Sequence, residues 1–138
     1  MIHCEYVDLK CPKCSYQVKA LYGTGFLGFP GDDTLREDIL AGRKGAEAKT
    51  VLERYPDSEA RLTSYFYRCP KCRILSSHIR TIIYEKKGWA NDYNLFTEKV
   101  TCPDCSIQLE EVSPETFYTI SCPECNSIMD ATDGGFWD

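Results

Sequence analysis

Short runs with the alternation and composition of β-strands dominate the chain. Such runs occur at residues 1–10, 16–20, 62–67 and 74–84, and the last of these is rich in Ile, Thr and Tyr. A period of two is the pattern of a strand with one buried face, and β-branched and aromatic residues favour strands further. The sequence therefore predicts a molecule built mainly from short strands.

The apolar spacing changes between residues 34 and 55, where it becomes helical. One apolar stripe begins at Leu35 and stops at Gly42, and a second runs on from Gly45. Thr34, with a glutamate three residues later, forms a capping box that predicts the start of the first helix. Whether the two glycines divide the segment into two helices or bend a single helix stays open at this point.

The C-terminal third has the features of a separate small unit. Residues 88–94 contain Gly, Asn and Asp and predict a linker, which divides the chain into a unit at 1–88 and a compact unit at 95–138. In the second unit we expect short strands, one of them through residues 117–120. Residues 130–138 form an acidic, aromatic tail that could present side chains to a partner.

Four copies of one tetrapeptide, Cys-Pro-x-Cys, interrupt these elements. They account for eight of the nine cysteines, and Cys4 is left over. The chain begins without a basic region and apolar run, and it contains no stretch of about 18 apolar residues, so neither a signal peptide nor a membrane span is expected. We therefore expect a cytoplasmic protein whose reduced cysteine pairs act as metal ligands or redox centres. The four pairs lie at residues 11–14, 69–72, 102–105 and 122–125.

Two cysteines separated by two residues form half of a tetrahedral metal site. A tight turn aims both sulfur atoms at one ion, and the proline after the first cysteine presets that turn. Sixteen residues separate the last two pairs, a spacing typical of zinc sites. We therefore predict two zinc ions and sequential pairing, first pair with second and third with fourth; interleaved pairing, first with third and second with fourth, is the alternative. The predicted metal ligands are Cys11, Cys14, Cys69, Cys72, Cys102, Cys105, Cys122 and Cys125.

A complete set of four thiolates indicates a structural metal. Such a site has no open coordination position, which argues against a zinc-activated water. A unit of residues 100–138 is also near the size at which domains need a metal or a disulfide to fold. Iron in a rubredoxin-like electron-transfer site is the chemical alternative, because tetrahedral sulfur also suits iron. Redox-active dithiols are a further alternative.

With these motifs the sequence resembles the zinc-ribbon superfamily, and more narrowly small uncharacterised bacterial proteins with paired Cys-Pro-x-Cys motifs. The resemblance rests on the eight cysteines, the four prolines and a helical segment between two corners. It implies zinc and an interaction role without fixing a partner. Together with the patterns above, it predicts a small metal-stabilised α+β fold of two β-rich zinc ribbons, the first with a helical insertion at about 34–55. Zinc ribbons usually place glycine after the second cysteine of a corner, whereas this chain has Ser15, Arg73, Ser106 and Asn126.

The two halves of the chain carry opposite charge. The net charge is −5, yet residues 100–138 contain eight acidic residues and no Lys or Arg, while residues 61–90 contain seven basic residues and one acidic residue. The basic stretch also contains aromatic residues, so it could pair with phosphates and stack on bases. Alternatively, it could balance the charge of a metal site or bind the acidic half of the same chain. The basic residues proposed to contact nucleic acid are Arg68, Lys71, Arg73, Arg80, Lys86 and Lys87.

An enzyme is the least favoured class of function. The chain has only two histidines, His3 and His78, and no phosphate-cradling motif or recognisable catalytic constellation. We therefore predict a non-enzymatic zinc-binding module with structural zinc sites that binds a protein partner as an adaptor. The alternative is a nucleic-acid-binding, transcription-related zinc-ribbon protein that uses the basic aromatic stretch 61–90. A rubredoxin-like iron electron carrier is the remaining alternative.

Overall fold

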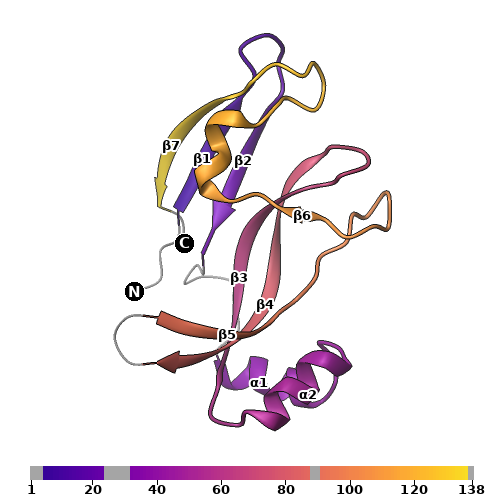
Figure 1. Ribbon diagram of the computed structural model, residues 1–138, viewed down its shortest axis with the longest axis vertical. Helices are drawn as coiled ribbons and strands as arrows, with labels where there is room; N and C mark the ends of the chain where they lie inside the picture. Colours follow the sequence, from indigo (N-terminus) through magenta and orange to yellow (C-terminus); the bar gives the residue numbers. More distant parts are fainter. Residues whose placement is uncertain (1–4, 24–31, 88–90, 137–138) are drawn as a thin grey trace.

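A computed structural model describes residues 5–23, 32–87 and 91–136 and contains two antiparallel sheets. The strand order is β2-β1-β7 in the first sheet and β5-β4-β3-β6 in the second. In Figure 1 the first sheet lies at the top, the second in the middle and two helices at the bottom, so the molecule is elongated. The elements are β1 (Glu5–Lys10), β2 (Gln17–Tyr22), α1 (Asp32–Leu40), α2 (Ala46–Arg54), β3 (Glu59–Arg68), β4 (Leu75–Lys87), β5 (Asn91–Thr97), β6 (Glu110–Glu111), the 3₁₀-helix η1 (Pro114–Thr119) and β7 (Asp130–Phe136).

The two sheets repeat one three-stranded arrangement. In each, a hairpin carries a Cys-Pro-x-Cys corner at its tip, and a strand from late in the chain pairs with the first strand of that hairpin. The outer unit consists of β1, β2 and β7, and the inner unit of β3, β4 and β6. Leu9 faces Val18 on β2 and Ala131 on β7 in the outer unit. Because β3 to β6 lie between β2 and β7 in sequence, the inner unit is inserted into the outer one.

The segment predicted to be helical forms two helices. Gly42 and Gly45 separate them, with φ of 85° and 98°, a backbone conformation that residues with a side chain rarely adopt. The predicted capping box is wrong, because α1 begins at Asp32 and Thr34 lies inside its first turn. The helices connect β2 to β3, between the two units, rather than forming an insertion inside the first Cys-to-Cys loop of a sequentially paired ribbon. Neither described helix is long and apolar enough to cross a membrane.

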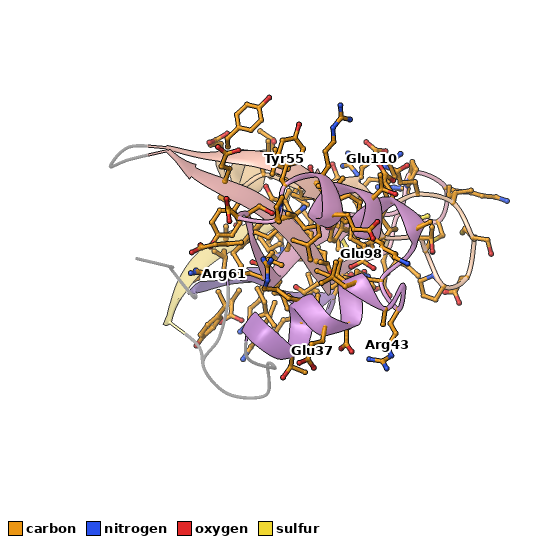
Figure 2. All side chains as sticks on the ribbon, turned by 90° about the horizontal axis from the view of Figure 1, so that it is seen from below. Glu37, Arg43, Tyr55, Arg61, Glu98 and Glu110 are labelled. Atoms are coloured by element: carbon orange, nitrogen blue, oxygen red, sulfur yellow. The ribbon has the colours of Figure 1, made fainter. Side chains whose placement is uncertain are left out.

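The helices cover the far end of the inner sheet. Their buried side chains pack against Ala60 of β3 and Ile83 of β4. Figure 2, seen from below, shows the two helices lying across that end, with Glu37 and Arg43 pointing away from the sheet. Most of the amphipathic stripe found in the sequence is therefore buried, while Leu40 at the end of α1 and Tyr55 after α2 are exposed. The helical residues of this core are Leu35, Ile39, Ala48 and Leu52.

The predicted linker is wrong. Residues 91–94 belong to β5, which pairs with β4: Tyr84 faces Asn94, and Glu85 faces Tyr93. A cluster of Gly, Asn and Asp marks the turn of a hairpin as well as a linker, and its composition alone does not separate the two. The rest of the predicted linker, residues 88–90, lies outside the described residues.

Two further expectations for the C-terminal region are also wrong. Residues 117–119 belong to the 3₁₀-helix η1 rather than to a strand; Pro114 occupies its first turn, and the Ser113 hydroxyl accepts a hydrogen bond from the Glu115 N–H. The predicted tail is strand β7, which pairs with β1 over residues 130–136. The local composition of residues 130–138 predicted a tail, because the partner strand β1 lies more than 100 residues away in sequence.

The two units share one apolar core. Phe66 and Leu75 of the inner unit pack in the same cluster as Leu9 and Ala20 of the outer unit. The Tyr22 hydroxyl donates a hydrogen bond to the Val112 carbonyl, which joins β2 to the chain that follows β6. The predicted division into 1–88 and 95–138 does not coincide with either unit, because each unit takes strands from both sides of it. The buried members of the shared core are Leu9, Cys11, Ala20, Tyr22, Phe66, Leu75, Val112, Ile120, Cys122 and Met129.

Candidate metal centres

The four Cys-Pro-x-Cys corners have a common backbone frame. In each, the N–H of the first cysteine donates to the carbonyl five residues later, which closes a tight loop around the pair. In three of them, the N–H of the residue after the second cysteine donates back to the carbonyl of the first, at 2.9 Å. The closing bonds run from Cys11 to Tyr16 (3.0 Å), Cys69 to Ile74 (3.0 Å), Cys102 to Ile107 (2.8 Å) and Cys122 to Ser127 (2.7 Å).

Three corners place a residue other than glycine in the left-handed region. Arg73, Ser106 and Asn126 have φ of 68°, 59° and 68°, and they are the only residues of this kind in the described part of the chain other than glycines. A side chain in this region costs about 1–2 kcal/mol. The corners therefore reach the geometry for which zinc ribbons use glycine, at some cost in backbone energy. Ser15, at the same position of the first corner, does not have a positive φ.

The eight predicted cysteines come together in two tetrads. The outer cluster is Cys11, Cys14, Cys122 and Cys125, and the inner cluster is Cys69, Cys72, Cys102 and Cys105. In each, the four Sγ atoms lie within 4.8 Å of one another.

The distances between sulfur atoms suit a tetrahedral metal rather than disulfides. The Sγ atoms of Cys11 and Cys125 lie 3.3 Å apart, and those of Cys14 and Cys122 lie 3.6 Å apart. In the inner cluster, Cys72 and Cys102 are separated by 3.8 Å. A zinc–sulfur bond of about 2.3 Å implies sulfur atoms about 3.8 Å apart in a tetrahedron. A disulfide would instead need about 2.05 Å. Both clusters can therefore hold a metal ion.

The predicted sequential pairing of the corners is wrong, and so is the interleaved alternative. The first corner joins the fourth, and the second joins the third, so the clusters are nested. The cause is strand pairing: β7 follows the fourth corner and pairs with β1, and β6 follows the third and pairs with β3. Sixteen residues separate the third and fourth corners, but η1 carries the chain from the inner unit to the outer one instead of closing a local ribbon.

Burial follows the order of the two cysteines in each corner. The first cysteine of every corner is buried, with Cys69 and Cys122 fully enclosed, while the second is more accessible and Cys125 is exposed. Backbone N–H groups donate to the buried sulfurs: those of Lys13, Cys72 and Glu124 lie 3.4 Å from the Sγ atoms of Cys11, Cys69 and Cys122 respectively. Such bonds favour the thiolate form, which is the form that binds metal.

Without a metal, the thiols of each cluster cannot all ionise together. Burial raises the pKa of Cys69, but backbone N–H groups of Cys72 and Lys71 outweigh it, and the pKa falls to about 6. In the same cluster, burial and hydrogen bonds with neighbouring thiols raise the pKa of Cys105 to about 12. The outer cluster divides in the same way: hydrogen bonds with Ser127 lower the pKa of Cys125 to about 6, whereas the pKa of Cys14 rises to about 12. For Cys14, a backbone hydrogen bond at Tyr16 acts to lower the pKa, but burial and the neighbouring thiols together outweigh it.

Metal binding at the inner cluster is expected to release at least two protons at pH 7. Cys69, with a pKa of about 6, is already ionised there, whereas the raised pKa values of Cys72 and Cys105 keep those thiols protonated until a cation displaces the protons. The apparent metal affinity should therefore rise about 100-fold or more per pH unit between about pH 6.5 and 8, and more steeply below pH 6. Competition with a chromophoric chelator across this range, with proton release followed by an indicator dye, checks it. Release of fewer than two protons per ion at pH 7 would contradict it.

Each cluster joins a corner flanked by basic residues to a corner flanked by acidic ones. Lys10, before the first corner, faces Asp130, after the fourth, in the β1–β7 register. Arg68, before the second corner, faces Glu110, after the third, in the β3–β6 register. Opposite charges that face each other on neighbouring strands stabilise their pairing. Strand pairing therefore places basic residues of one half next to acidic residues of the other at each cluster.

The basic residues proposed to contact nucleic acid do not form one free surface. Arg80 forms an ion pair with Glu111, donates to the Tyr67 hydroxyl at 3.2 Å and lies 4.2 Å from the centre of the Tyr65 ring. Arg73 donates to a backbone carbonyl. The side chains of Lys86 and Lys87 lie outside the described residues, and Arg68 and Lys71 are exposed.

A small cavity beside the inner cluster was missed by sequence reasoning. It measures about 130 Å³ and includes His78, Cys69 and Cys102 in its wall. His78 shares a hydrogen bond of 2.7 Å with the Ser76 hydroxyl, and burial lowers its pKa. The alternation of β4 could have placed both residues on one face, but nothing in the sequence placed that face beside the third corner.

Comparisons of the chain with models of protein families, with curated proteins and with solved structures find no match.

Proposed function

We propose that the protein is a non-enzymatic module in which each cysteine tetrad holds one structural zinc ion. The observation that carries this proposal is the convergence of eight cysteines from four distant corners into two sets, each with all Sγ atoms within 4.8 Å. Four sulfur ligands complete a tetrahedral shell and leave no position for a reacting water or substrate. Iron would accept the same ligands, so the identity of the metal is part of the test.

The size of the units supports a structural role for the ions. Each sheet is small, and the shared core joins them through a limited set of buried side chains. Structural zinc contributes about 10–16 kcal/mol of apparent binding free energy, which is as large as the stability of a typical domain, about 5–15 kcal/mol. Two such ions would account for how corners so distant in sequence stay together.

A protein is the partner that the surface favours. Three of the four corners expose an isoleucine beside the metal ligands: Ile74, Ile107 and Ile128 are 44%, 36% and 51% exposed. Apolar side chains on a rigid, metal-fixed loop suit contact with another protein surface. A nucleic acid is the weaker candidate, because the net charge is −5 and Arg80 and Arg73 are engaged within the chain.

Elemental analysis of the purified protein is expected to find about two zinc ions per chain. Replacement by Co²⁺ should give the visible absorption of tetrahedral sulfur coordination, and strong chelation should unfold the protein. A red protein that contains two iron ions per chain would show that iron occupies the sites. That result would favour electron transfer over a structural role. Fewer than two tightly held ions of any kind would contradict the proposal.

The choice of partner is tested on the metal-loaded protein. We expect the protein not to change the electrophoretic mobility of DNA or RNA at about 0.15 M salt, where contacts with phosphates would still be measurable. Binding that weakens steeply as salt increases, and that is lost in the variant Lys71→Glu, would favour the nucleic-acid alternative instead. The matched control is Lys44→Glu, between the two helices and away from the clusters.

A further inference from the structure

We propose that residues 73–75, chiefly Arg73, couple the two clusters, so that a metal ion bound in one raises the affinity of the other. This inference rests on the proposed function, because it takes metal binding by both tetrads as given. The segment follows Cys72 of the inner cluster directly, and it contacts both corners of the outer cluster.

Arg73 reaches the fourth corner. Its guanidinium donates a hydrogen bond of 3.3 Å to the carbonyl of Cys122, a ligand of the outer cluster. The same carbonyl accepts the 2.9 Å bond from the Asn126 N–H that closes the fourth corner. A carbonyl has two lone pairs, so both bonds form together. The Arg73 side chain therefore holds the turn that orients Cys122 and Cys125.

Leu75 reaches the first corner. The Tyr16 side chain packs against the shared core that contains Leu75, and the Tyr16 carbonyl accepts the bond that closes the first corner. The Leu75 side chain, 3% exposed, lies in the shared core with Cys11 and Cys122. When metal orders the 69–72 corner, the residues that follow it are placed to order both corners of the outer cluster.

The residue type at position 73 is consistent with this role. Arg73 has φ of 68°, where glycine would be unstrained. The corresponding residue of the third corner, Ser106, has φ of 59° and an exposed side chain. An arginine in this conformation costs backbone energy. Its long side chain, however, makes the contact with the Cys122 carbonyl of the other unit, which neither glycine nor serine could make.

Nesting alone does not supply enough coupling. Cys14 and Cys122 lie 108 positions apart, and closing the inner cluster shortens that loop by about a third, which changes the affinity by less than about twofold. Allosteric coupling between sites is typically about 5- to 150-fold. Most of the coupling must therefore come from the contacts between the units, namely those of residues 73–75 and the shared core. Neither cluster exists in the unfolded chain, and each must be ordered to bind metal.

Native mass spectrometry of the metal-free protein with one equivalent of Zn²⁺ per chain tests the proposal. Two equal, independent sites would leave about half of the chains with a single ion, and a fivefold coupling lowers this to roughly a third. We expect the singly loaded fraction of the wild-type protein to be about a third or lower. Arg73→Gly, which relieves the left-handed strain but removes the contact, should raise the singly loaded fraction to about half or more.

Two variants separate the contact from general effects on the corners. Ser106→Gly relieves the same strain in the third corner without breaking a contact between clusters, and it should behave as the wild type. Tyr16→Ala removes the side chain that packs the first corner against the core around Leu75, and it should raise the singly loaded fraction by an intermediate amount. If the wild type binds two ions but shows half of its chains singly loaded, or if Arg73→Gly matches the wild type, the coupling is overturned while the proposed function stands. Binding of fewer than two ions overturns both.

Discussion

The double variant Cys14→Ser/Cys125→Ser is expected to retain one tightly bound metal ion per chain, whereas Cys14→Ser/Cys72→Ser is expected to retain none. In the nested arrangement, Cys14 and Cys125 belong to the same cluster, so removing both disables one site and leaves the inner site with four ligands. Cys14 and Cys72 belong to different clusters, so removing both leaves three ligands in each. Since each structural ion contributes about 10–16 kcal/mol, this is the largest change that a pair of side chains can produce here.

Sequential pairing of the corners predicts the reverse result. Cys14 and Cys72 would then share a site, so Cys14→Ser/Cys72→Ser would keep one ion and Cys14→Ser/Cys125→Ser would keep none. Metal content after gel filtration distinguishes the two outcomes, and Co²⁺ absorption shows whether the remaining site keeps four sulfur ligands. The mirror pair Cys72→Ser/Cys105→Ser is the matched control, since it should disable only the inner site.

Phe66→Ala is expected to lower the free energy of unfolding by about 3–5 kcal/mol, the range for deleting a buried phenylalanine. Phe66 lies on β3 of the inner unit, is fully buried and packs among residues of the outer unit. The cavity should therefore weaken both units, and both metal sites should be lost in a single transition at lower denaturant. Urea unfolding followed by circular dichroism and by Co²⁺ absorption checks this.

The control for Phe66→Ala is Ile79→Ala on the neighbouring strand β4. Ile79 is 54% exposed, so its loss should change stability by no more than about 0.5 kcal/mol. Two separate transitions in the Phe66→Ala protein, with one metal site kept at the wild-type denaturant concentration, would show that the units fold independently. That result would make the outer and inner units two separate folding domains.

The distribution of charge along the sequence was a better guide to the pairing of the corners than the sequence spacing between the corners. Sequential pairing brings together two corners flanked by Lys and Arg, and then two flanked by Asp and Glu. Four thiolates around a divalent ion leave a charge of about −2, so an acidic surrounding in the second site would have no compensation. The observed pairing sets Lys10 opposite Asp130 and Arg68 opposite Glu110. The fold thus brings oppositely charged residues of the two halves side by side at both clusters.

The sequence by itself determined much of the local structure and the type of metal ligand. The spacing of each Cys-Pro-x-Cys pair predicted a corner that aims two sulfurs at one point, and all eight cysteines lie in tetrads that can hold metal. The alternation in β3 and β4 and the helical stripe that starts at Leu35 predicted elements that are present. These features depend on residues within about ten positions of one another, over which periodicity and turn chemistry are informative.

Only the tertiary structure decided which corners meet. The order of the strands joins β1 to β7 and β3 to β6, and lengthening a loop costs so little entropy that sequence distance is a weak guide to pairing. The same limit explains the errors at 88–94 and at 130–138, where composition suggested a linker and a tail although both contain strands. The role of Arg73 was also hidden, because a departure from glycine becomes interpretable only when the carbonyl that it contacts, 49 positions away, is in view.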